Sequence, residues 1–148
     1  MKRVWITLKS AGLTGTLAVK QKKNIIKNCQ VIIMTPDIIH AWLLANIGDK
    51  EIMKFVASIL LVVVDEVHTY TGVFGSNSAF LFRRLRHLMA VADNSPQFIC
   101  ASATIANPEV HLKNLFGVQF YLIGSELDTS PRYEVEILLV KPPRIADF

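Results

Sequence analysis

The sequence predicts an α/β fold with a mostly parallel sheet flanked by helices. Three short apolar runs carry this prediction, because each ends abruptly in small or acidic polar residues; they are residues 31–34, 59–64 and 98–101. Short runs that are apolar at every position are typical of strands buried on both faces of a parallel sheet. Segments with helical periodicity lie between the runs, and this alternation indicates an α/β layered domain.

The helices are predicted from apolar spacing and end signals. Residues 78–92 are the strongest candidate, and their apolar stripe consists of Leu81, Leu85, Leu88 and Met89. Residues 107–109 supply a cap, a first-turn proline and an acid near the positive end of the helix dipole, and Gly117 closes that helix. Residues 19–28, which are basic, and residues 50–58 complete the predicted set.

Weaker strand predictions lie near both ends of the chain. Val4, Ile6 and Leu8 alternate with polar or bulky neighbours, which favours an early strand. Residues 118–123 and 133–140 are expected to form two further strands, and Lys141-Pro142-Pro143 then reads as a linker. Gly72 and Gly75 are expected to shape a loop through positive φ angles.

Composition narrows the functional classes. The chain has 148 residues, 51% of them hydrophobic and 19% charged, which fits one globular domain. The apolar excess also fits a piece of a larger enzyme, and the net charge of +4 is compatible with nucleic-acid binding. Cys29 and Cys100 form no CxxC pair, so buried thiols are expected rather than disulfides or zinc ligands. No apolar run is long enough to span a membrane and no signal peptide is recognisable, so a cytoplasmic setting is expected.

The acidic pair Asp65-Glu66 is the most informative polar cluster, since it follows six apolar residues directly. In open α/β sheets, ligands bind beyond the carboxyl ends of the strands. One carboxylate there can hold Mg²⁺, and a second can orient and deprotonate the water that attacks a γ-phosphate. The alternative is an ordinary strand end with solvated acids, and the pair alone does not decide between the two.

Two more polar clusters occupy equivalent positions. Ser102-Ala103-Thr104 and Thr35-Pro36-Asp37 each follow an apolar run, although either one alone is an ordinary turn before a helix. His68 stands two positions after Glu66, and no second histidine lies at the spacing of a zinc site. We expect all three clusters to lie on one rim of a single sheet.

The order Thr-Pro-Asp, Asp-Glu-Val-His and Ser-Ala-Thr, each after a buried strand, resembles superfamily-2 DEAD/DEAH-box helicases. The resemblance implies a RecA-like lobe that uses ATP and Mg²⁺. It implies that Thr35, Pro36 and Asp37 touch the nucleic-acid backbone. Asp65, Glu66 and His68 then belong to the Walker B motif, with Asp65 at the metal. Ser102, Ala103 and Thr104 would couple hydrolysis to strand separation.

Finer detail resembles the YprA-like repair-helicase branch, which favours DNA over RNA as the substrate. The resemblance rests on residues 64–76, 82–86, 101–108 and 128–132. It implies the later part of the first RecA-like lobe over residues 14–140. Residues 1–13 match this pattern poorly, and residues 141–148 are interpreted as a linker or tail.

Departures from the family pattern shape the functional expectation. The sequence contains no GxxxxGK[ST] loop and no second RecA-like lobe. We therefore expect a fragment of an ATP-dependent helicase that is inactive alone and needs the missing segments as partners. The alternatives are a non-catalytic module that binds nucleic acid or a partner, and a fragment of a translocase that does not unwind. Arg83, Arg84 and Arg86 are interpreted as a solvated helix face in preference to a contact with an accessory domain or nucleic acid.

Overall fold

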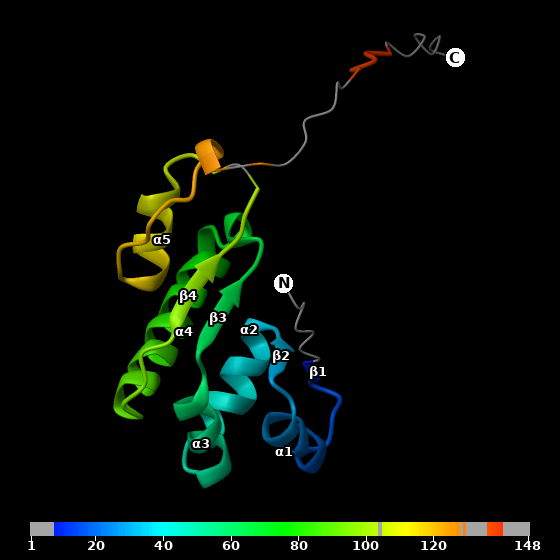
Figure 1. Ribbon diagram of the computed structural model, residues 1–148, viewed down its shortest axis with the longest axis vertical. Coiled ribbons are helices and arrows are strands. Elements are labelled where there is room, and N and C mark those ends of the chain that lie inside the picture. Colours follow the sequence, from blue (N-terminus) through cyan, green and yellow to red (C-terminus); the bar gives the residue numbers. More distant parts are fainter. Residues whose placement is uncertain (1–7, 104, 128, 130–135, 141–148) are drawn as a thin grey trace, which may run out of the picture.

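The computed structural model describes residues 8–103, 105–127, 129 and 136–140 (Figure 1). Strands and helices alternate along the chain, as predicted. The strands are β1 (Ser10–Leu13), β2 (Val31–Met34), β3 (Leu61–Val64) and β4 (Gln97–Cys100). The α-helices are α1 (Val19–Asn28), α2 (Pro36–Ile38), α3 (Lys50–Ser58), α4 (Gly72–Val91) and α5 (Pro108–Phe116). Short helical turns are η1 (Ile39–Leu43), η2 (Leu44–Asn46), η3 (Val67–Thr69) and η4 (Ser125–Leu127).

The strands pair in parallel but form two separate sheets among the described residues. β1 pairs with β2, and β3 pairs with β4 in the register Val64↔Cys100. The α/β fold class is confirmed, whereas the prediction of one sheet holding all three apolar runs is wrong. Apolar runs identify strands buried in a sheet, but they do not say which strand lies beside which.

Helices α4 and α5 cover one face of the β3–β4 sheet. Val64 packs with Phe82 of α4 and with Leu115 and Phe116 of α5, and the rings of Phe82 and Phe116 stack 4.7 Å apart. The predicted stripe of α4 is buried in the other main cluster, with residues of α1, η1 and α3. The opposite face of the β3–β4 sheet is open, since Val63 is 60% exposed and Leu61 and Ile99 are also exposed.

Helix α4 begins six residues earlier than predicted, at Gly72 rather than at residue 78. Gly72 has the expected positive φ, of 57°. Gly75 does not; it lies inside α4, where a Cβ would clash with the carbonyl oxygen of Tyr70. Close backbone approach is therefore the reason for glycine at position 75.

Two of the three arginines of α4 hold the end of α5 rather than forming a purely solvated face. Arg83 donates from Nη2 to the Asn114 carbonyl at 2.7 Å, and Arg86 donates from Nη1 to the Phe116 carbonyl at 2.8 Å. The last carbonyls of a helix lack intrahelical partners, so these guanidinium groups cap α5 from outside. Gly117 closes α5 in the left-handed region, as predicted.

Several local predictions are wrong or fall outside the described residues. Residues 118–123 form no strand, and neither do residues 136–140. A strand needs a ladder partner, and none lies beside either segment among the described residues. The first described strand is β1, and the predicted strand around Val4 and Ile6 lies outside the described residues, as do residues 133–135 and 141–148. Asn107 precedes α5 in a left-handed conformation and donates or accepts no side-chain cap bond.

The two cysteines are half-buried and unbonded to each other. Burial raises the pKa of the Cys100 thiol to about 11, which keeps it protonated and unreactive near neutral pH. In the parts of the chain that the structure describes, no helix is long and apolar enough to cross a membrane.

The close approach at Gly75 generates a stability prediction. Gly75→Ala should lower the free energy of unfolding by about 1–3 kcal/mol, because the new methyl group overpacks against the Tyr70 backbone. Alanine ordinarily stabilises a helix interior relative to glycine, so the sign is diagnostic. Urea unfolding followed by circular dichroism measures the change, with Gly48→Ala as the control because a Cβ there meets open space. A Gly75→Ala chain as stable as the unmodified chain would contradict the packing argument.

Candidate functional site

The acidic pair forms a tight turn at the carboxyl end of β3. Asp65 and Glu66 are both exposed, and Glu66 adopts a left-handed conformation with φ 52° and ψ 41°. The Glu66 amide donates to Oδ1 of Asp65 at 2.8 Å. This backbone conformation costs roughly 1–2 kcal/mol for a residue with a side chain, and it persists only where its surroundings impose it.

The surroundings of Glu66 do impose the conformation. Its carbonyl accepts two bonds from Thr69, one from the amide at 2.9 Å and one from Oγ1 at 2.8 Å. The next residue, Val67, is buried, and its amide donates to the Ala101 carbonyl at 3.1 Å. The turn is therefore held both by its own η3 and by the end of β4.

His68 links the acidic turn to the Ser-Ala-Thr segment. Its Nδ1 lies 3.2 Å from Oε2 of Glu66 and 3.1 Å from Oγ of Ser102. A protonated Nδ1 donates to both oxygens as a three-centre bond. Because β3 and β4 are parallel, their carboxyl ends meet at one edge, and His68 bridges them there.

The predicted site is thus assembled in part. Ser102 and Ala103 are exposed beside the acidic turn, whereas Thr104 lies outside the described residues. Thr35 is extended before α2, and Pro36 takes the first helical position as expected. These residues follow β2 in the other sheet, and no hydrogen bond among the described residues joins Thr35, Pro36 or Asp37 to the acidic turn.

Magnesium would have to be held by few protein ligands here. The described residues contain no group of three or more histidine, cysteine or acidic side chains that could hold a metal ion together. Asp65 nevertheless fits a cation bound through one carboxylate, water and phosphate oxygens, which is the usual Mg²⁺ arrangement at nucleotide sites. Its side chain is exposed, and only Oδ1 accepts a hydrogen bond among the described residues.

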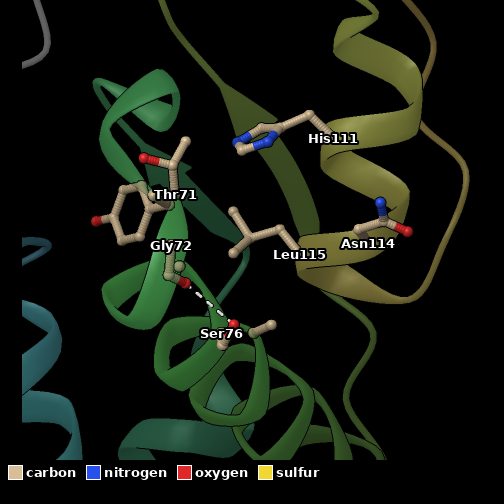
Figure 2. Close-up of a pocket in the computed structure, with 9 residues that line it drawn as sticks. Thr71, Gly72, Ser76, His111, Asn114 and Leu115 are labelled. Carbon is tan, nitrogen blue, oxygen red and sulfur yellow. Dashed lines mark hydrogen bonds between the residues drawn. The ribbon is translucent and has the colours of Figure 1, made fainter.

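A cleft of about 350 Å³ lies behind the acidic turn, between the start of α4 and helix α5 (Figure 2). Thr71, Gly72 and Ser76 line one side, and His111, Asn114 and Leu115 of α5 line the other. His111 crosses toward the turn, and its Nε2 donates to the Val67 carbonyl at 2.8 Å. Sequence reasoning missed His111, since a single histidine within a helix carries no spacing signal.

Known helicases resemble this chain in sequence. The sequence model of the DEAD/DEAH box helicase family matches residues 2–112, which is more than half of the chain. The uncharacterized ATP-dependent helicase MJ1574 of Methanocaldococcus jannaschii is 34% identical over 132 residues, covering 88% of this chain and 19% of that protein. The uncharacterized ATP-dependent helicase YprA of Bacillus subtilis is 32% identical over 138 residues, covering 93% of this chain and 18% of that protein.

A solved helicase structure resembles this chain in fold. The crystal structure of DUF1998 helicase MrfA bound to DNA and AMPPNP superimposes with a TM-score of 0.74 at 32% identity, covering 81% of this chain and 17% of that one. The chain thus spans about a fifth of the length of each of these proteins. The RecA-like fold class and the resemblance to the YprA-like branch are confirmed. The chain belongs to the DEAD/DEAH box helicase family.

Proposed function

We propose that this chain supplies the later part of the first RecA-like lobe of an ATP-dependent DNA helicase. The observation that supports this most is the acidic turn. Two exposed carboxylates, Asp65 and Glu66, stand at the carboxyl end of a parallel strand, and His68 joins Glu66 to Ser102 on the neighbouring strand end. The relatives supply the ATP and DNA in this proposal, since one solved neighbour is bound to DNA and AMPPNP.

The residues divide the chemistry between them. Asp65 holds Mg²⁺ in this proposal, and the ion supplies charge neutralisation on the phosphates when bound. Glu66 orients a water molecule and accepts its proton as the water attacks the γ-phosphate. His68 contacts both Ser102, which follows β4, and the Glu66 carboxylate. A movement of the segment 102–104 would therefore act on Glu66 through His68, which suits a coupling role for this segment.

The open sheet face supports the need for further polypeptide. Parallel sheets are normally buried on both faces, yet the exposed positions of β2 and β3 are apolar, with Ile33 at 68% and Val63 at 60% exposure. We propose that segments bearing the phosphate-binding loop, together with a second RecA-like lobe, complete the enzyme. Cytoplasmic location and a role in DNA repair belong to the same proposal.

A non-catalytic module is the second candidate function. The observation that favours it is the lack of a GxxxxGK[ST] loop in the 148 residues. Such a lobe would bind nucleic acid or a protein partner without turnover. The two candidates differ in whether the acidic turn matters once the missing parts are supplied.

The chain alone is predicted to bind ATP weakly and to hydrolyse it at the background rate. Its sequence contains no GxxxxGK[ST] motif, whose backbone amides and lysine would hold the phosphates. Phosphate release by the purified chain, with and without Mg²⁺ and DNA, tests this, and Glu66→Gln is the control for a contaminating ATPase. Mg²⁺-dependent turnover that Glu66→Gln abolishes would show that a nucleotide site exists within these 148 residues.

A chimera tests the catalytic roles. The chain replaces the matching segment of MrfA, and ATP hydrolysis and unwinding are measured side by side. Glu66→Gln should slow hydrolysis by roughly 10²- to 10⁴-fold while ATP still binds, because an amide cannot accept the proton. Asp65→Ala should weaken Mg²⁺-dependent nucleotide binding as well as turnover. Ser102→Ala with Thr104→Ala should reduce unwinding more than hydrolysis.

The control for the chimera is Glu51→Gln on α3, whose exposed carboxylate pairs with Lys27 at 3.8 Å and lies far in sequence from the acidic turn. That variant should keep the activity of the parent chimera. An active Glu66→Gln chimera would show that the acidic pair is an ordinary strand end with solvated acids. An inactive parent chimera with intact folding would favour the non-catalytic module.

Binding of nucleic acid by the chain should be weak and nearly independent of base sequence, because contacts around Thr35 and Asp37 would be made to the backbone. Fluorescence anisotropy with two unrelated single-stranded DNA oligonucleotides measures it. Affinity should fall roughly tenfold between 50 and 200 mM salt if about two or three phosphates are contacted. Tight binding to one oligonucleotide that survives high salt would contradict backbone recognition.

A further inference from the structure

We infer that His111 is a positioning residue that fixes the backbone turn carrying Glu66. This inference rests on the proposed role of Glu66 as the residue that accepts the proton from water. His111 does not touch Glu66 itself. Its Nε2 donates to the carbonyl of Val67, the residue that follows Glu66, at 2.8 Å. Figure 2 shows the imidazole reaching from α5 toward the opposite wall of the cleft.

Val67, the residue after Glu66, is held through both of its peptide groups. The Val67 amide donates to the Ala101 carbonyl at 3.1 Å, and the Val67 carbonyl accepts from His111 and from the Tyr70 amide, the latter at 3.2 Å. The Val67 side chain is only 2% exposed, so it anchors the turn in the core. Of these hydrogen bonds, the one from His111 is the only one made by a side chain, and it ties the turn to α5.

Glu66 needs such restraint because its φ of 52° is unfavourable for a residue with a side chain. The Glu66–Val67 peptide sets the ψ of Glu66, and the bond from His111 to the Val67 carbonyl holds the next peptide and so restrains the turn that carries the Glu66 carboxylate. Without the imidazole, the Val67 carbonyl loses one of its two donors, and the turn can relax toward more favourable backbone angles. The carboxylate would then spend less time where it can accept a proton from water.

Helix α5, which carries His111, is held in place by buried side chains and by two arginines. Leu115 and Phe116 are buried at 3% and 0% exposure, and Arg83 and Arg86 bind the last carbonyls of the helix. The same segment of chain runs from Ser102 into α5, so it contacts the acidic turn twice. Ser102 does so through His68, and His111 does so through the Val67 backbone. The second contact was absent from the motif-based prediction.

The test uses the MrfA chimera and three substitutions that differ in where a donor lies. The amide nitrogen of His111→Gln reaches about as far as Nε2, whereas that of His111→Asn stops near the position of Nδ1. His111→Leu has no donor. His111→Asn and His111→Leu should lower kcat for DNA-stimulated hydrolysis by about 3- to 10-fold, the range for one lost hydrogen bond, with KM for ATP changed less than twofold. His111→Gln should retain most of kcat.

His87→Leu on α4 is the matched control, since His87 is exposed and outside the cleft, and it should leave kcat unchanged. Full activity of both His111→Asn and His111→Leu would overturn the inference. So would equal losses in His111→Gln, His111→Asn and His111→Leu, because a purely structural role is insensitive to donor position. If His111→Leu fails to fold, the comparison of Gln with Asn still decides. An active Glu66→Gln chimera would instead overturn the proposed function, so the two failures are distinguishable.

Discussion

The parallel pairing of β3 with β4 is the constraint on which the candidate site depends. The register Val64↔Cys100 places the ends of both strands at one edge, where His68 bridges Glu66 and Ser102. The ladder continues past the strands, since the Ala101 amide donates to the Val64 carbonyl at 2.9 Å and the Val67 amide returns a bond to Ala101. A slip of one residue would turn Val64 away from Phe82 and Phe116, so core packing fixes the register and hence the site.

Helices α4 and α5 hold the segments that flank the acidic turn. They pack on the buried face of β3 and β4 through Phe82, Leu115 and Phe116, and Arg83 and Arg86 tie the end of α5 to α4. Gly75 lets the start of α4 approach the Tyr70 carbonyl, which sets the path of the chain as it leaves the acidic turn. The backbone that carries the exposed carboxylates is thus well packed, although the carboxylate side chains themselves make few contacts.

The sequence predicted those features that depend on local pattern. Helices α1 and α3 have the predicted bounds, and the acidic pair and Ser102 lie at one edge. Both features follow from residues that are close together in the sequence: the periodicity of apolar residues and the position at which a strand ends. Features that depend on neighbours were not predictable in this way. Residues 118–123 have strand-like composition but no ladder partner among the described residues, and Arg83 and Arg86 find carbonyls thirty or so positions away. The roles of Asp65, Glu66 and the Thr35 segment stay predictions.

The two sheets and their open faces have one physical explanation. β-branched side chains such as Val63 and Ile33 favour pleated, covered surfaces, and leaving them in water forfeits roughly 25 cal/mol for each Å² of apolar surface that a partner would bury. Helices cover only one face of β3 and β4, and no described strand pairs with the outer edges of β2, β3 or β4. A covering layer and added strands would satisfy both the apolar faces and the unpaired backbone groups at once. In the proposed enzyme, a phosphate-binding loop supplied by such added segments would face the edge where Asp65 and Glu66 stand, since ligands of parallel sheets bind at the carboxyl ends of their strands.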